Sequence, residues 1–173
     1  MILVGGVGQL WQGDLDLGRR AAERLALELA GPDVYVEDLY YGAVAVAQRL
    51  DELRPEALVV VGATSRGRPP GIVEVRTVAV LSLAEDAVQL AVADAVTGYV
   101  AVDLLLEVAG GLGALPPVTV VVDVEPATVE PGDDLSPEAT AALEQAMDMV
   151  RAEVAALRPA GPDGSASFPA TAG

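Results

Sequence analysis

The sequence contains no cysteine and no histidine among its 173 residues. The absence of cysteine excludes disulfide bonds, thiol catalysis and thiolate metal sites. The absence of histidine has the larger consequence, because a hydrolytic serine–histidine–aspartate triad and a histidine-ligated zinc or nickel site both need imidazole. The absence of these two residue types therefore excludes several common forms of hydrolytic chemistry.

Basic residues are scarce: 10 lysines and arginines stand against 26 acidic residues, for a formal charge of −16. This balance argues against nucleic acid and anionic membrane surfaces as partners. Charges interrupt every apolar run, so none is long enough to span a bilayer, and the N-terminus lacks the features of a secretory signal. We therefore expect a cytoplasmic protein, whose acidic surface serves solubility or, more specifically, a basic protein partner.

Apolar segments alternate between strand-like runs and helix-like periods along the chain. The expected strands are 1–4, 33–37, 57–61, 72–80 and 118–124, and the expected helices are 16–30, 43–53, 83–96, 102–109 and 136–157. This order predicts an α/β fold, a three-layer α/β/α sandwich around a mostly parallel, five-stranded twisted sheet, with 72–80 as a candidate edge strand. Residues 1–158 form one expected domain, and 159–173, rich in Pro, Gly, Ser and Ala, an expected disordered tail.

The first strand runs into a glycine-containing loop and then an acidic turn. Gly6 and Gly8 match the first two glycines of a dinucleotide fingerprint, but Trp11 stands at the third position, and no P-loop lysine follows. An acidic turn also repels phosphate. We therefore expect no nucleotide site, and we expect Asp14 or Asp16 to cap the helix that follows.

Several segments in order resemble motifs of one enzyme family. Residues 8–18 are similar to a Gly-Asn-x-Leu-x-Gly-Asp-Asp/Glu-Gly-x-Gly pattern, and the further matches are residues 59–71, 103–105, 113–116, 124–126 and 132–138. Together they resemble the hydrogenase maturation endopeptidases, which trim the C-terminal extension from the large subunit of nickel–iron hydrogenases. The resemblance spans about residues 1–157 and implies that family's fold.

The same resemblance implies that this chain lacks the metal-binding chemistry of the family. Its members are thought to bind the nickel of their precursor through two carboxylates and a histidine. The matching positions here are Leu15, Gly62 and, near the expected histidine, Thr97. Asp16 offers at most a displaced carboxylate, and one carboxylate does not make a site for a metal that prefers imidazole. We therefore expect no catalytic residue, no metal site and no cofactor, since the nickel in this family belongs to the substrate.

A candidate crevice for a ligand or partner lies where the strands end. Its candidate residues are Gly6, Gly8, Gln9, Trp11, Asp14, Asp16, Gly62, Thr64, Arg66 and Thr97. Within it, Trp11 is either an exposed partner anchor or part of the core. Arg66 and Arg68 form either a carboxylate clamp or, as we favour, a solvated loop.

Two further expectations concern loops. Of the adjacent aromatics Tyr40 and Tyr41, we expect one to be packed and one exposed. The acidic segment 125–134 is expected to be a solvated loop.

Three functional hypotheses follow. The favoured one is a non-catalytic or altered maturation-protease-like protein that recognises or helps assemble a nickel–iron hydrogenase large subunit. The second is an active endopeptidase that removes the C-terminal extension of that subunit. The third is a small-molecule binding module that uses the strand-end crevice, which rests on analogy with other α/β folds.

Overall fold

The computed structural model describes residues 1–79 and 101–158. Its strands are β1 (Ile2–Val7), β2 (Val34–Asp38), β3 (Ala57–Ala63), β4 (Val73–Val78) and β5 (Val118–Val124). Its helices are the 3₁₀ turn η1 (Gly13–Asp16), α1 (Leu17–Leu29), α2 (Ala43–Leu53), α4 (Val102–Gly111) and α5 (Pro137–Leu157). The helix expected over 83–96 and the tail expected over 159–173 lie outside the described residues.

The five strands form one sheet in the order β2-β1-β3-β5-β4. Strands β2, β1, β3 and β5 run parallel, and β4 pairs antiparallel with β5 at one edge. The central strands are almost wholly buried, as expected of apolar, β-branched runs covered on both faces. The mostly parallel sheet and the edge position of the fourth strand were both predicted from the sequence, and both are confirmed.

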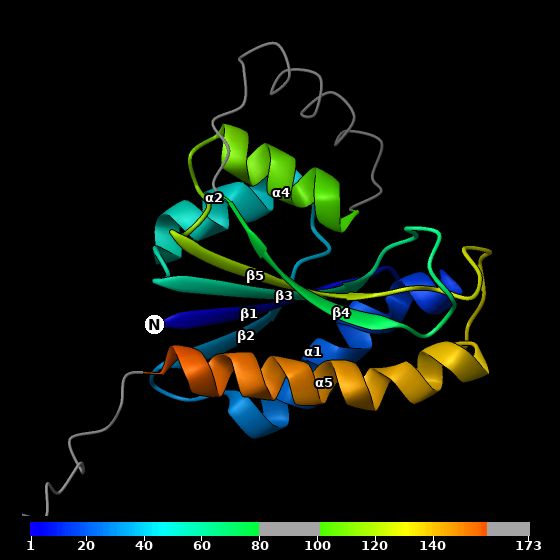
Figure 1. Cartoon of the computed structure of the whole chain (residues 1–173). Coiled ribbons are helices and arrows are strands. Elements are labelled where there is room, and N and C mark those ends of the chain that lie inside the picture. The colour runs from blue at the N-terminus through cyan, green and yellow to red at the C-terminus, as the bar shows by residue number, and fades with distance from the viewer. Residues whose placement is uncertain (80–100, 159–173) are drawn as a thin grey trace, which may run out of the picture.

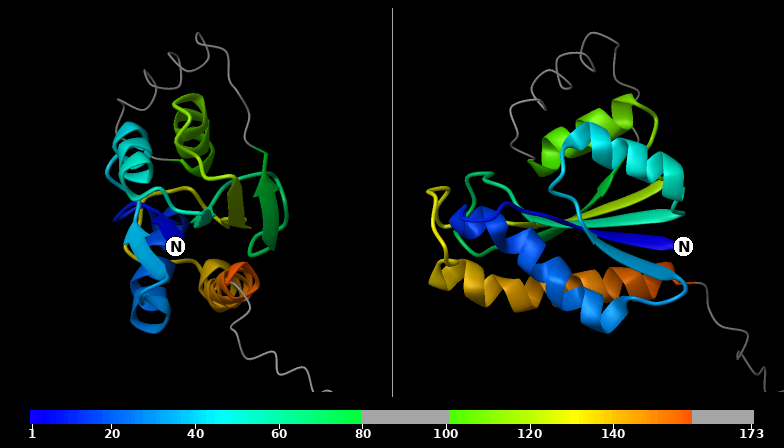
Figure 2. Two further views of the ribbon diagram at one scale, coloured as in Figure 1. Left: turned by 90° about the vertical axis from the view of Figure 1, so that its left-hand side faces the viewer. Right: turned by 180° about the vertical axis from the view of Figure 1, so that it is seen from behind.

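Helices cover the two faces of the sheet in pairs, so the protein has three layers. Helices α1 and α5 pack on one face, and α2 and α4 pack on the other (Figure 1; Figure 2). Strand alternation divides the core accordingly. Ile2 and Val4 of β1 point towards α1 and α5, whereas Leu3 and Val7 point towards α2 and α4.

The last helix begins as its sequence predicts. The Ser136 hydroxyl accepts a hydrogen bond from the backbone N–H of Ala139 at 3.1 Å, and Pro137 occupies the first turn. Helix α5 then runs for 21 residues along the sheet (Figure 1). No helix of the described residues has the length and apolar character that a membrane crossing requires.

The strand order determines where a site can form. Strand β1 lies between β2 and β3, and the chain crosses to opposite faces of the sheet on leaving β1 and β2. In open α/β sheets, crevices occur beyond the carboxyl ends of strands at such a reversal. The turn after β1 and the ends of β2 and β3 are therefore the places to look for a site.

Candidate functional site

The turn after β1 is held in place by the loop that precedes α5. The backbone N–H of Gly13 donates to the Gly132 carbonyl at 2.8 Å, and Gly132 N–H donates to the Trp11 carbonyl at 2.9 Å. Trp11 adopts a left-handed backbone, with φ of 61°, and its side chain is 69% exposed. Of the two alternatives for Trp11, the exposed position is therefore the one observed.

Asp14 anchors that loop rather than capping α1. Its carboxylate is fully buried and accepts hydrogen bonds from the backbone N–H of Ala127 at 2.8 Å and Thr128 at 3.2 Å. It also accepts from the N–H and the hydroxyl of Ser136, at 2.6 and 2.8 Å. Asp16 does occupy the N-cap position of α1, as one of the two residues expected there, but neither carboxylate accepts a hydrogen bond from a backbone N–H of the first turn, so the expected capping bond does not form.

Asp16 stands at the start of α1, but its carboxylate binds arginine side chains. Arg19 donates to both oxygens at 2.5 Å, and Arg20 Nε donates to Oδ2 at 2.9 Å. Asp16 is 2% exposed. Two guanidinium groups thus neutralise the single carboxylate that was the weak candidate for a metal ligand.

The positions that match the nickel ligands do not fit a nickel ion. Leu15 is half-buried and carries no donor atom. Gly62 is buried, and a Cβ placed on it would lie 2.6 Å from Cγ2 of Val102 and 3.2 Å from the Val7 carbonyl oxygen. Across residues 1–79 and 101–158, no three acidic side chains are grouped so as to hold a metal. Thr97 lies outside these residues.

Gly6 serves helix packing rather than the crevice. A Cβ on Gly6 would lie 2.3 Å from the Gly18 carbonyl oxygen and 2.5 Å from Cβ of Ala22. Helix α1 therefore approaches β1 more closely than any side chain at this position would allow. Gly6 on β1 and Gly18 on α1 thus explain how α1 sits on the sheet.

A pocket of about 440 Å³ opens beside the turn, at the carboxyl ends of β1 and β2. The described residues that line it are Gly8, Gln9, Leu10, Trp11, Gln12, Arg19, Glu23, Asp38 and Tyr40. Gly8, Gln9 and Trp11 belong to the predicted crevice. Five other residues of that prediction do not line this pocket: Asp14, Asp16, Gly62, Thr64 and Arg66. The observed pocket is therefore on the β2 side of β1, whereas the prediction placed the crevice around Gly6, Gly62 and Thr97.

Asp38, the last residue of β2, is one of the ionisable residues of the pocket, with Arg19 and Glu23, that the sequence analysis did not identify. Its Oδ1 is buried and has no hydrogen-bond partner among the described residues. Burial raises the pKa of Asp38 to about 6; the nearby Arg19 lowers it, and Glu23 and Asp16 raise it. An acid at the end of an apolar strand, where α/β sheets bind ligands, was the available signal.

Arg19 does not neutralise Asp38 through a hydrogen bond. Its Nε and Nη2 donate to Asp16, and its Nη1 donates to Glu23. These carboxylates take up all three guanidinium nitrogens. Asp38 therefore adds a negative charge that Arg19 offsets only at a distance.

Two aromatic side chains, Trp11 and Tyr40, line the pocket, and Tyr41 follows Tyr40 in sequence. Tyr40 is 60% exposed and Tyr41 is 41% exposed, so the expectation that one of them is packed is wrong. Their rings meet edge to face, with centroids 6.1 Å apart. Trp11 and Tyr40 both line the pocket from different strand ends.

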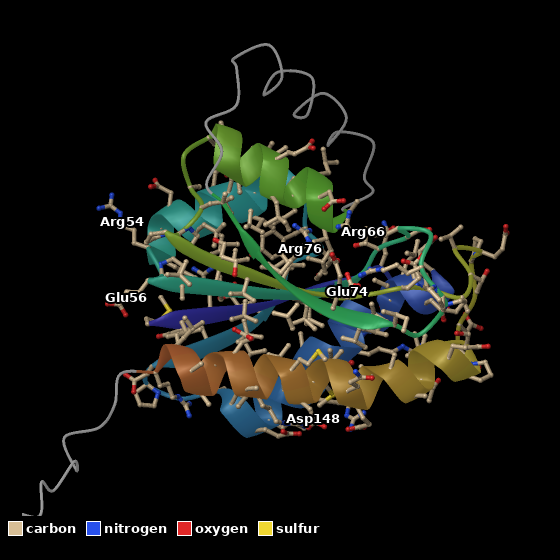
Figure 3. All side chains as sticks on the ribbon, viewed as in Figure 1. Arg54, Glu56, Arg66, Glu74, Arg76 and Asp148 are labelled. Atoms are coloured by element: carbon tan, nitrogen blue, oxygen red, sulfur yellow. The ribbon has the colours of Figure 1, made fainter. Side chains whose placement is uncertain are left out.

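A second charged cluster lies between the β3 loop, β4, β5 and α4. Arg66 and Arg76 lie between β4 and α4 (Figure 3). Both donate to Asp123 Oδ2 and to Asp103 Oδ1, at 2.8 to 3.1 Å. Asp123 is 1% exposed and is paired in register with Gly62. Arg66 therefore binds carboxylates of its own chain rather than those of a ligand, and the residue itself stays exposed, in agreement with the favoured interpretation of a solvated loop that balances nearby acids.

The neighbouring Glu125 is also buried. It accepts from the backbone N–H of Arg66 at 2.9 and 3.0 Å, from Gly67 N–H at 3.1 Å and from Arg68 Nε at 3.1 Å. Burial by itself would raise the pKa of Glu125, but these donors outweigh it and hold the pKa below its usual range. The prediction of a solvated loop is wrong at this residue, which ties two loops together.

Thr64 begins the same loop. Its backbone N–H donates to the Val124 carbonyl at 3.0 Å, and its buried hydroxyl has no hydrogen-bond partner among the described residues. Arg68 also pairs with Glu74 of β4. The loop after β3 is therefore fixed to β5 and β4 by its own charges.

Comparison with known proteins identifies the fold. No protein-family model matches the sequence, and no curated protein matches it. Among solved structures, the hydrogenase 2 maturation peptidase from Thaumarchaeota archaeon SCGC_AB-539-E09 is 26% identical, with a TM-score of 0.63, over 88% of this chain and 97% of that chain. The hydrogenase maturating endopeptidase HybD from Escherichia coli is also 26% identical, with a TM-score of 0.63, over 90% and 92%.

A more distant structure agrees. The [NiFe] hydrogenase maturation protease HycI from Thermococcus kodakarensis KOD1 is 18% identical, with a TM-score of 0.56, over 86% of this chain and 88% of that chain. These matches confirm the resemblance drawn from the sequence motifs, and they confirm the predicted fold.

Proposed function

We propose that this chain, which has the fold of the hydrogenase maturation proteases, recognises a nickel–iron hydrogenase large subunit without cleaving it. It would act as a binding or assembly protein built on a peptidase framework. The main support for this proposal is the chemistry of the residues at the positions that match the nickel ligands of the family. Leu15 has no donor atom, and Gly62 is covered by Val102 so closely that a side chain there would clash.

The electrostatics beside Gly62 support this proposal. Its register partner on β5 is Asp123, whose carboxylate is engaged by Arg66 and Arg76. Two guanidinium groups in this place disfavour the approach of a divalent cation. The chain also contains no histidine that could replace the missing imidazole.

The second candidate is an active endopeptidase that removes the C-terminal extension of a large subunit. The fold shared with maturation peptidases favours it. It would need metal ligands from the substrate or from outside the described residues. The third candidate, a small-molecule binding module, is supported by the pocket of about 440 Å³ at the ends of β1 and β2, a volume in the range of ligand pockets.

The test incubates this protein with a nickel-loaded, C-terminally extended hydrogenase large subunit encoded in the same genome. Intact-mass analysis reports cleavage, and size-exclusion chromatography reports a complex. A stable complex without loss of the extension is the expected result. Release of the extension would overturn the non-catalytic assignment and support the endopeptidase. Absence of both would reject recognition of this subunit.

A variant control separates binding from chemistry. Asp16→Asn removes the carboxylate that directly follows Leu15, the position at which the family resemblance implies a ligand. If the protein only binds, this variant should leave the mass of the large subunit unchanged and any complex intact. Nickel held in stoichiometric amount by the wild-type protein, but not by this variant, would count against the proposal.

A further inference from the structure

The pocket at the ends of β1 and β2 combines an acidic interior with an aromatic rim. We propose that it binds the cationic side chain, arginine or lysine, of a partner polypeptide. This inference rests on the proposed function in that the partner is a protein, but it assigns a recognition site separate from the lost nickel positions. Asp38, Trp11 and Tyr40 are the residues that carry it.

The first argument is the uncompensated charge. Asp38 lines the pocket, and its Oδ1 is buried and lacks a hydrogen-bond partner among the described residues. A buried carboxylate oxygen without a donor is unfavourable, and a guanidinium or ammonium group would satisfy it through a charge-assisted hydrogen bond. Arg19 does not do so in this structure, where its side-chain hydrogen bonds go to Asp16 and Glu23. The pocket therefore selects a cation from outside.

The second argument is the rim. Trp11, Tyr40 and Leu10 are exposed by 69%, 60% and 52%, and all three line the pocket. Aromatic faces attract cations, and their apolar surface also packs against the methylene stem of arginine or lysine. A ligand that carries only a cation, such as a metal ion, would use the carboxylate but not this surface. A long basic side chain uses both.

The third argument is the backbone of Trp11. A bulky residue with a φ of 61° is strained, and this strain places the largest side chain of the loop at the surface. Glycine or asparagine would fit that backbone without strain. Retention of an exposed indole at a strained position is consistent with a role in contacting a partner.

The fourth argument is the field of the whole protein. A formal charge of −16 attracts basic segments and repels acidic ones. Such a field raises the rate at which a basic peptide meets the pocket, and it suppresses acidic competitors. The local and overall charges thus favour the same class of occupant.

The test uses capped tripeptides, acetyl-Ala-X-Ala-amide, with X as Arg, Lys, Gln or Glu. Trp11 is the only tryptophan of the chain, so its fluorescence reports directly on the pocket. The Arg and Lys peptides should change that fluorescence saturably at concentrations up to about 10 mM, and the Gln and Glu peptides should not. Equal binding of the Gln peptide, or no binding of either basic peptide, would overturn the proposal.

Matched variants locate the interaction. Asp38→Asn should weaken binding of the Arg peptide at least about fivefold, as expected for loss of a charge-assisted hydrogen bond. Asp33→Asn makes the same change in the exposed turn just before β2, at the opposite end of that strand, and should leave binding unchanged. Tyr40→Leu keeps the fluorescent reporter and should also weaken binding. Unchanged affinity in Asp38→Asn with a native circular dichroism spectrum would overturn the assignment.

The two proposals fail separately. If the large subunit forms a complex but basic peptides do not bind, the pocket assignment is wrong and the proposed function stands. If basic peptides bind through Asp38 but no large subunit is retained, the pocket assignment stands and the partner must be another protein.

Discussion

The Asp14 carboxylate accepts hydrogen bonds from both the backbone N–H and the hydroxyl of Ser136, at 2.6 and 2.8 Å. This contact joins the turn after β1 to the first residue before α5. Ser136 in turn caps α5 by accepting from Ala139 N–H. One buried carboxylate thus sets the position of the pocket loop and the start of the last helix together.

Asp14→Ala should therefore lower the free energy of unfolding by about 3 kcal/mol, because four donors lose a buried acceptor. Urea denaturation followed by circular dichroism measures the change. Asp133→Ala, at an exposed position in the same loop, is the control and should change stability by less than about 0.5 kcal/mol. Equal effects in the two variants would contradict the anchoring role of Asp14.

Gly62→Asp restores the acid expected at that position of the family pattern, but it should destabilise the protein by about 2–3 kcal/mol. The new Cβ would lie 2.6 Å from Val102 Cγ2, and the β-branched valine cannot rotate freely out of the way. Combination with Val102→Ala should recover at least about 1 kcal/mol relative to the sum of the single changes. A double-mutant cycle by urea denaturation measures this coupling, and simple additivity would show that Val102 does not close the position.

Asp38 should make the protein more stable as the pH falls from 7 towards 5. Its folded pKa of about 6 lies above the ordinary value of 3.8, since burial opposes the charged form, while Arg19 lowers it and Glu23 and Asp16 raise it. Its ionisation thus opposes folding fully above pH 6, and the penalty disappears below 3.8. Asp38→Asn should raise the free energy of unfolding at pH 8 by about 1 kcal/mol after allowance for solvent screening.

The same variant should have a much smaller effect at pH 4, where the wild-type carboxyl is protonated in the folded state and the pH is close to the ordinary pKa of 3.8. Denaturation at the two pH values tests this, and NMR titration of the Asp38 carboxyl gives its pKa directly. A titration midpoint near the ordinary value would contradict the buried position of Oδ1.

The contribution of Glu125 to the free energy of unfolding should depend on pH in the opposite sense to that of Asp38. Its folded pKa lies below the ordinary value of 4.5, since the backbone donors of Arg66 and Gly67 and the side chain of Arg68 outweigh burial. Its contribution is complete above pH 4.5 and is lost as the pH falls through the lower, folded pKa. Glu125→Gln should lower the free energy of unfolding by about 2 kcal/mol at pH 7.

The difference in the free energy of unfolding between wild type and Glu125→Gln should become smaller below pH 4.5. Glu130→Gln, an exposed residue of the loop before α5, is the matched control and should have little effect at either pH. A constant difference between wild type and Glu125→Gln across this pH range would show that the charge of Glu125 is not what the donors recognise.

Periodic and compositional signals predicted the layers, the sheet and the edge strand. Local sequence is sufficient to predict two elements. The β-branched residues of 118–124 favour a strand, and Ser136-Pro137 favours the start of a helix. The role of Asp14 could not be predicted in this way. Its partners lie more than 110 residues away in sequence, and no local pattern distinguishes an anchor from a helix cap.

The candidate site was predicted only in part for a similar reason. Gly8, Gln9 and Trp11 were identified because they belong to the opening motif. Asp38 was missed because its importance depends on being the last residue of the strand beside β1, which is a property of the sheet order. The carboxylate partners of Arg66 could not be predicted, because they come from α4 and β5.

The late position of α5 has a consequence for synthesis of the protein. This helix covers the face of the sheet formed by Val59, Val122 and Val124, yet it begins only at Pro137. While a ribosome is still extending the chain, α5 does not yet cover these valines, and this apolar surface remains exposed to solvent. Newly made molecules should therefore be most vulnerable to aggregation, and most in need of chaperones, until the last helix has emerged from the exit tunnel.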